Sequence, residues 1–255
     1  MSASVDFAYA QARLQARHGR RPSEADWRRL DAIRDPSHYL QTARTTALRP
    51  WVLGLGPQVP VHEMAAQLRR HFRGYVEETA RWQPAPWRPA VVWVAELPML
   101  PLLRELLTAD RLPAWIRADP RLQEVVQDSR EARRAALERT RWSPLLTAWT
   151  QDRPLRAGWL THWRTLWPAE TGIHRDALAQ LQHRVQAHID WMASASADKG
   201  VAAREALARV LLRLFRRYDR QPAATFAHLG LIALDLERLR GEVAERLLFK
   251  GAEAA

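Results

Sequence analysis

The fold class follows from one stretch near the start of the chain, Phe7-Ala-Tyr-Ala-Gln-Ala-Arg-Leu-Gln-Ala-Arg-His-Gly19. Phe7, Ala10 and Leu14 recur at the three- and four-residue spacing that places side chains on one face of an α-helix. A serine and an aspartate just before the stretch are suitable helix caps, and glycine is a common helix stop. The stretch therefore predicts a helix that ends before Gly19.

The same periodicity recurs through most of the chain, divided by prolines, glycines and capping residues. Ser23 is expected to cap the second helix, because Asp26 follows at the spacing of a capping box. Residues 50–60 hold three prolines and two glycines and are expected to form a loop. The other helices are expected at about 35–48, 64–82, 90–107, 119–139, 171–192, 201–218 and 222–249, with short tryptophan-rich helices between 143 and 167.

The apolar segment from Ala90 to Leu107 is the one place where a strand competes with a helix. Val91, Val92 and Val94 are β-branched residues, which favour strands. No second strand-like run exists to pair with this segment, so we expect a buried helix. The chain is therefore expected to be all-α.

A proline-rich segment, Trp82-Gln-Pro-Ala-Pro-Trp-Arg-Pro89, is the expected domain boundary. Its three prolines disfavour a continuous helix through it. The prediction is an N-terminal lobe over residues 1–83 and central and C-terminal lobes over 84–255, or one continuous domain.

Charge and composition narrow the classes of function. The 255 residues include 37 arginines and only two lysines, and the formal net charge is +11. This balance favours an anionic partner, whether a nucleic acid, an acidic protein or an acidic membrane surface. Cysteine is absent, which excludes disulfides and thiolate chemistry. No secretory signal or membrane-spanning run is evident, so we expect a cytoplasmic protein, free or peripheral to the membrane through a complex.

No constellation of catalytic type is found. His183 and His188 are five residues apart, which separates them by about 140° around a helix. Gly54-Leu-Gly56 lacks the lysine and hydroxyl of a phosphate-binding loop. We therefore expect no enzyme, no metal and no cofactor. A histidine-using enzyme on a helical bundle is the least favoured alternative.

Two features invite a functional interpretation. Glu96 is a lone carboxylate among apolar residues, so it is expected to point to solvent or to an arginine, or else to form a buried pair that organises the fold. Five tryptophans lie between Trp142 and Trp167 among arginines. They fill the cores of short helices, or stack on bases in an arginine-rich nucleic-acid-binding or scaffold protein.

Three short sequence segments, called words below, resemble a family of V-type ATPase adaptor subunits. These are the C-type subunits (d-type in eukaryotes), which join the central stalk to the rotor ring. The first word is Asp6-Phe-Ala-Tyr9 followed by Ala12-Arg13, Arg17 and Gly19. The second is the apolar segment Val91 to Arg111, which resembles the family's central helix, although the family's asparagine pattern is absent. The third is Ala233-Leu-Asp-Leu-Glu-Arg-Leu-Arg240, which resembles its final helix.

The resemblance implies a non-catalytic adaptor, in a shortened chain. In the family, a funnel of three small helical lobes sits on the membrane rotor ring and receives the central shaft, so that ATP turnover is coupled to ion flow. The implied partners are therefore the ring and shaft proteins of a rotary ATPase. The family-like positions are Phe7, Tyr9, Arg13, Arg17, Gly19, Glu96, Asp235, Glu237, Leu239 and Arg240. The terminal helices are expected to pack on each other or on the central apolar helix.

Overall fold

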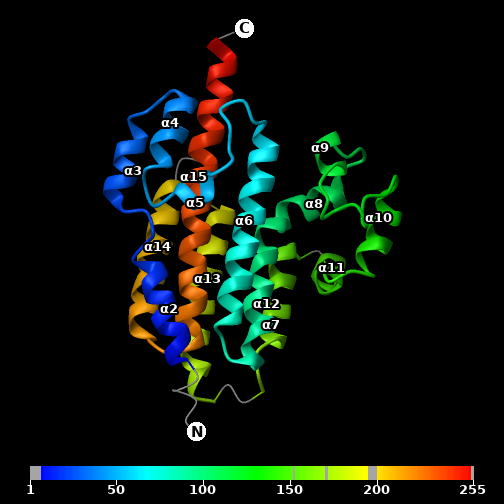
Figure 1. Cartoon of the computed structure of the whole chain (residues 1–255). Helices are drawn as coiled ribbons and strands as arrows, with labels where there is room; N and C mark the ends of the chain where they lie inside the picture. Colours follow the sequence, from blue (N-terminus) through cyan, green and yellow to red (C-terminus); the bar gives the residue numbers. More distant parts are fainter. Residues whose placement is uncertain (1–6, 152, 170–171, 195–199, 254–255) are drawn as a thin grey trace. The chain divides into compact units, whose positions relative to one another are not determined.

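A computed structural model describes residues 7–151, 153–169, 172–194 and 200–253. Helices packed together make up the fold, and no β-strand occurs among these residues (Figure 1). The all-α prediction is confirmed, including the preference for helix over strand in the valine-rich segment. Within the described ranges, no helix is long and apolar enough to cross a membrane.

The chain forms two compact units. Unit 1 combines Met1–Ala85 with Ala169–Ala255, and unit 2 is Pro86–Pro168. The chain leaves unit 1 in the proline-rich segment, where a boundary is expected. It then returns to unit 1, so the lobe expected over 84–255 is distributed over both units.

Unit 1 is built around its long C-terminal helix, α15 (Pro222–Glu253). Figure 1 shows α15 running among the other helices of this unit, and it contacts α2, α4, α6, α13 and α14. The helices of unit 1 before the boundary are α2 (Ala8–His18), α3 (Glu24–Asp31), α4 (Pro36–Ala43), α5 (Arg49–Val52) and α6 (Val61–Arg81). After the return come the short 3₁₀ turn η3 (Gly172–His174), α13 (Arg175–Ser194) and α14 (Gly200–Arg217).

Local sequence explains where several of these helices begin. Ser23 and Asp26 form the expected capping box at the start of α3. Asp35 caps α4 by accepting a hydrogen bond from the backbone N–H of His38 at 2.8 Å. The residues expected to cap α2 lie outside the described part of the chain. The helix expected over 35–48 ends at Ala43, and part of the expected loop after it forms α5.

Apolar stripes of the long helices make the core of unit 1. On α6 the buried residues include Met64, Leu68 and Phe72, as their spacing predicts. On α15, Leu229, Ile232, Leu236, Leu239 and Val243 recur every three or four residues and are buried. The helix α14 packs closely on α15 at Gly230, where an added Cβ would lie 2.9 Å from a methyl carbon of Leu211.

Unit 2 consists of shorter helices and turns. They are η1 (Ala85–Trp87), which begins at the boundary, α7 (Arg88–Trp93), η2 (Val94–Met99), α8 (Leu100–Thr108), α9 (Ala114–Arg117), α10 (Arg130–Leu137), α11 (Ser143–Thr150) and α12 (Leu155–Thr165). The apolar segment 90–107 is therefore helical but not one helix. Pro98 lies within η2, and proline removes a backbone donor from a helix interior.

The prediction of a helix over 119–139 is wrong for its first part, because residues 119–129 form turns and bends. The Asp119 carboxylate accepts a hydrogen bond from the backbone N–H of Arg121 at 3.0 Å, which stabilises a local turn instead of a helix start. The helix α10 begins only at Arg130, where the Ser129 hydroxyl accepts from the backbone N–H of Ala132 at 3.1 Å.

Four tryptophans of unit 2 are packing residues. Trp93 and Trp159 each donate an indole N–H to the other's backbone carbonyl, at 3.2 and 3.3 Å. These two, Trp142 and Trp163 are at most 6% exposed. The helices α11 and α12 approach closely at Gly158, where a Cβ would lie 3.1 Å from backbone atoms of Leu145. Because these rings are buried, they do not offer free faces to nucleic-acid bases.

Candidate interaction site

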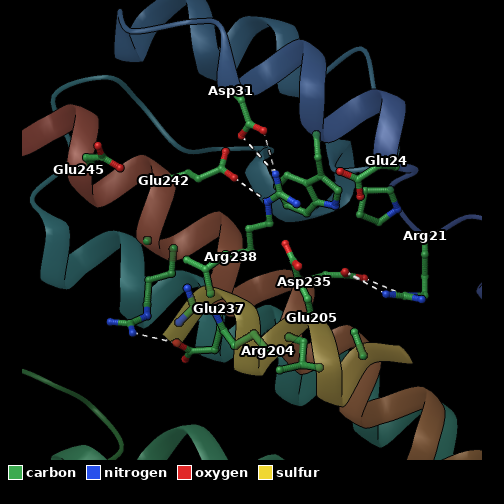
Figure 2. A pocket seen from close by; sticks show the side chains of 17 residues that line it. Arg21, Glu24, Asp31, Arg204, Glu205, Asp235, Glu237, Arg238, Glu242 and Glu245 are labelled. Carbon is green, nitrogen blue, oxygen red and sulfur yellow. Dashed lines mark hydrogen bonds and ion pairs between the residues drawn. The ribbon is translucent and has the colours of Figure 1, made fainter. Parts of the chain in front are cut away.

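A charged cleft of about 740 Å³ lies on unit 1, lined by α3, α14, α15 and the turn before α3 (Figure 2). Seven carboxylates and four guanidinium groups line it, in a protein of net charge +11. The carboxylates belong to Glu24, Asp31, Glu205, Asp235, Glu237, Glu242 and Glu245, and the guanidinium groups to Arg21, Arg204, Arg238 and Arg240. The cleft is therefore an acidic exception on a basic protein.

Arg238 is the centre of a cluster of two carboxylates and one aromatic ring in the cleft. Its guanidinium carbon lies 4.4 Å from the centre of the Trp27 ring. It donates to Asp31 at 3.0 Å and to Glu242 at 2.7 Å, as Figure 2 shows. Burial would lower the pKa of Arg238, but the two carboxylates outweigh it and the pKa is raised. This cluster joins α3 to α15.

A second ion pair joins Arg21, two residues after the first family-like word, to Asp235 of the third. The Arg21 guanidinium binds Asp235 through two hydrogen bonds, at 2.8 and 2.9 Å (Figure 2). Both side chains are largely buried, with 17% and 12% exposed. Burial raises the pKa of Asp235 despite the opposing effect of Arg21. A two-pronged pair of this kind fixes orientation as well as distance.

Two histidines lie next to this pair. The rings of His18 and His228 are 5.8 Å apart, and His228 Nε2 is 2.6 Å from the Tyr75 hydroxyl. Burial, together with nearby arginines, lowers the pKa of His18 to about 4. Burial, then the charges of His18, Arg21 and Arg17, lower the pKa of His228 to about 3. Both imidazoles are therefore neutral at physiological pH.

The predicted positions of the third word divide between the cleft and the core. Asp235, Glu237 and Arg240 line the cleft, and Glu237 accepts a hydrogen bond from Arg240 at 2.9 Å. Leu239 is fully buried in the core of unit 1. The structure thus brings three of these four residues into one site, and the fourth holds the helix in place.

The predicted residues of the first word lie in three different places: the core, the outer side of α2 and the end of α2. Phe7 is buried, and its ring meets that of His174 edge-on at 5.5 Å. Tyr9, Arg13 and Arg17 lie along α2 toward the end of α6, outside the cleft lining. Gly19 ends α2 with φ −66°, and an added Cβ would be 3.6 Å from its nearest neighbour. The helix stop therefore does not depend on glycine.

Glu96 belongs to unit 2, not to the cleft. It is 2% exposed and accepts hydrogen bonds from Arg121 and from the Trp142 indole, both at 2.8 Å. The Arg141 guanidinium is 3.7 Å away. Of the sequence alternatives, the pairing with arginine holds, and the pair is buried.

The Arg238 cluster and the pairing of His18 with His228 could not be predicted from the sequence. The only local signal was the four-residue spacing of Arg238 and Glu242, which suits an ion pair on a helix. Asp31 and Trp27 are about two hundred positions away, so no local pattern could connect them. His188, singled out in the sequence, is half-buried on α13, and His183 is exposed. Within the described ranges, no three or more potential metal ligands are grouped.

Comparison with known proteins gives no matching family model, no matching curated protein and no matching solved structure.

Proposed function

We propose that this protein is a non-catalytic adaptor that connects the central shaft of a V-type rotary ATPase to its membrane ring, in ATP-linked ion transport. The supporting observation is the packing of α2 on α15, the helices that hold the first and third family-like words. Arg21, two residues after the first word, binds Asp235 of the third. Two words more than two hundred residues apart thus contribute to one structural assembly.

The physical properties of unit 1 suit a load-bearing connector. Its long helix α15 is tied to a neighbouring segment by a buried ion pair, between Asp235 and Arg21 of the turn before α3, which resists movement of the helix along that segment. The excess of arginine supplies charge-assisted hydrogen bonds to acidic residues of a shaft and to carbonyl ends of ring helices. Both contacts need shape and charge, and neither needs a reaction at this chain.

The test is recovery of partners from native membranes. The full chain with a terminal tag is expressed at its natural level, solubilised in mild detergent and purified at about 150 mM salt, which weakens non-specific contacts between exposed charges. Ring and shaft proteins should co-purify in constant proportion to the tagged chain. An equally basic, unrelated helical protein with the same tag is the control for electrostatic capture.

A functional measurement completes the test. In membranes that lack this chain, ATP hydrolysis should continue while ATP-driven ion uptake falls, because shaft and ring are no longer coupled. Re-expression of the chain should restore uptake. The proposal fails if neither ring nor shaft is recovered above the control and coupling is unchanged without the chain.

The nucleic-acid alternative is tested in parallel by titrating a labelled single-stranded oligonucleotide at about 150 mM salt, where each neutralised phosphate strengthens the salt dependence. Trp159 and Trp163 are buried, so such binding could not use the faces of these two rings. Sub-micromolar binding without recovery of rotary-ATPase proteins would replace the adaptor with this alternative.

A further inference from the structure

Cations and aromatic rings alternate on the outer side of α2. Five side chains take part: Tyr9, Arg13 and Arg17 on α2, and Tyr75 and Trp82 at the end of α6. The Arg13 guanidinium carbon is 5.3 Å from the Tyr9 ring centre and 5.6 Å from that of Trp82. The Arg17 carbon is 5.5 Å from the Trp82 centre and 5.4 Å from that of Tyr75. We call this set the cation–aromatic ladder.

Arg17 forms the complete step of the ladder. It contacts the rings on either side of it, and one guanidinium nitrogen also donates to Glu78 at 2.5 Å. A guanidinium that lies against a ring still presents its N–H groups at its edge, where a carboxylate can accept them. The ladder itself therefore shows which ligand suits a guanidinium held in this way.

Arg13 occupies the equivalent step one helical turn earlier, without a carboxylate. Its Nε donates to the Tyr9 hydroxyl at 3.1 Å, and its two rings flank it as the rings of Arg17 do. In the described part of the chain, no carboxylate lies within ion-pair distance of Arg13. Arg13 is exposed, and Tyr9 is 57% exposed, so this step opens to solvent.

We propose that Arg13 binds a side-chain carboxylate of an acidic segment in a partner protein, with the exposed part of Tyr9 packing against that segment. This inference rests on the proposed adaptor function for the identity of the partner and adds the contact residues. Tyrosine, tryptophan and arginine are the residue types that dominate binding energy in protein interfaces. A planar fork of donors also matches a carboxylate in a way that a lysine ammonium does not.

A protein partner is favoured over single-stranded nucleic acid by the state of the rings. Single-strand binding relies on open aromatic faces on which bases stack. Here two guanidinium groups already lie against Trp82, and Arg13 also lies against Tyr9. What remains available is the donor edge of Arg13, together with the exposed part of Tyr9.

The first experiment measures the chemistry of this step with a fluorescein-labelled oligoglutamate peptide, by fluorescence anisotropy at about 150 mM salt. Arg13→Gln removes the charge, and Arg13→Lys keeps the charge but loses the planar fork. Arg184→Gln is the matched control, because Arg184 is an exposed arginine on α13 outside the ladder and loses the same charge. Thermal unfolding of all three variants verifies that unit 1 remains folded.

Both Arg13 variants should weaken peptide binding by about threefold or more relative to Arg184→Gln, the range of an exposed but well-oriented ion pair. Equal weakening by Arg13→Gln and Arg184→Gln would mean that only net charge matters and would overturn the proposal. Wild-type affinity in Arg13→Lys would do the same. Tighter binding of an oligothymidylate of equal charge, lost on Arg13→Gln, would assign the ladder to nucleic acid instead.

The second experiment separates this inference from the adaptor function. Tyr9 is replaced by p-benzoylphenylalanine in cells, and light-induced cross-links are mapped by mass spectrometry. A cross-link to an acidic segment of a ring or shaft protein supports both proposals. A cross-link to an acidic segment of another protein, lost on Arg13→Gln, supports the ladder and refutes the adaptor. Recovery of ring and shaft proteins by wild type and Arg13→Gln alike, with no cross-link at position 9, supports the adaptor and refutes the ladder.

Discussion

Acidification should destabilise unit 1 through the buried imidazole of His228. In the folded protein the pKa of His228 is lowered from the ordinary 6.5 to about 3, first by burial and then by His18 and the arginines nearby. The unfolded chain takes up a proton near pH 6.5, while the folded chain does not. The stabilising contribution is therefore complete above pH 6.5 and declines as the pH falls from 6.5 toward 3.

The magnitude follows from the width of that interval. Of the range between about pH 7.5 and pH 5, only the lowest ~1.5 pH units lie below the pKa of the unfolded chain. Each pH unit corresponds to about 1.36 kcal/mol, so the free energy of unfolding should fall by about 2 kcal/mol. His18 acts in the same direction, because burial also lowers its pKa. Burial raises the pKa of Asp235 and Glu242, so acid favours the folded state through these two groups. The contribution of His228 must therefore be isolated by substitution.

The assay is urea unfolding of wild type and His228→Gln, monitored by circular dichroism, at several pH values between about 7.5 and 5. Glutamine does not titrate and still offers a hydrogen-bonding group to Tyr75. The fall in stability over this range should be about 2 kcal/mol smaller in the variant. His183→Gln, at an exposed histidine, should keep the wild-type slope. Identical slopes for wild type and His228→Gln would refute the argument.

Three further predictions concern packing and the buried carboxylate. Leu239→Ala should lower the free energy of unfolding, measured in urea, by about 2–4 kcal/mol because the side chain is fully buried. Leu248→Ala, at a side chain that is 67% exposed, should change it by less than about 0.5 kcal/mol. Equal effects of the two substitutions would contradict the assigned core. Gly158→Ala should lower the free energy of unfolding by about 1–3 kcal/mol, because its Cβ would meet backbone atoms at 3.1 Å. Gly74→Ala, with open space around it in α6, should raise the free energy of unfolding by about 0.5–1 kcal/mol. Stabilisation by both substitutions would show that α11 and α12 are not closely packed. Glu96→Gln should cost about 3 kcal/mol, measured by thermal unfolding, since it leaves a guanidinium without its buried partner; an unchanged melting temperature would place the carboxylate in water.

Local chemistry made the helices and several of their ends predictable. The capping box of Ser23 with Asp26 and the apolar stripe of α6 were readable because each depends on residues three or four positions apart. The same local logic failed at Asp119, where the side chain accepts a hydrogen bond from the backbone N–H of Arg121 and this bond competes with helix formation. At Pro98 the apolar pattern continued while the backbone geometry changed to a 3₁₀ turn.

The candidate site was only partly predictable, for a geometric reason. Asp235, Glu237 and Arg240 were singled out from their place in one word of the sequence, and they do line the cleft. Their partners could not be found in the same way. Arg21 is separated from Asp235 by more than two hundred positions, and no spacing rule operates over that distance.

The sequence by itself determined the helical class, the core stripe of α15 and the basic character of the protein, because periodicity and charge are properties of neighbouring residues. Only the tertiary structure decided that the chain leaves unit 1 and returns to it, so that α15 packs on α2 and α6. That packing gathers carboxylates of three segments into one cleft and places Trp82 between Arg13 and Arg17. Contacts of this kind depend on how helices distant in the chain meet, and the physics of burial selects that arrangement for the molecule as a whole.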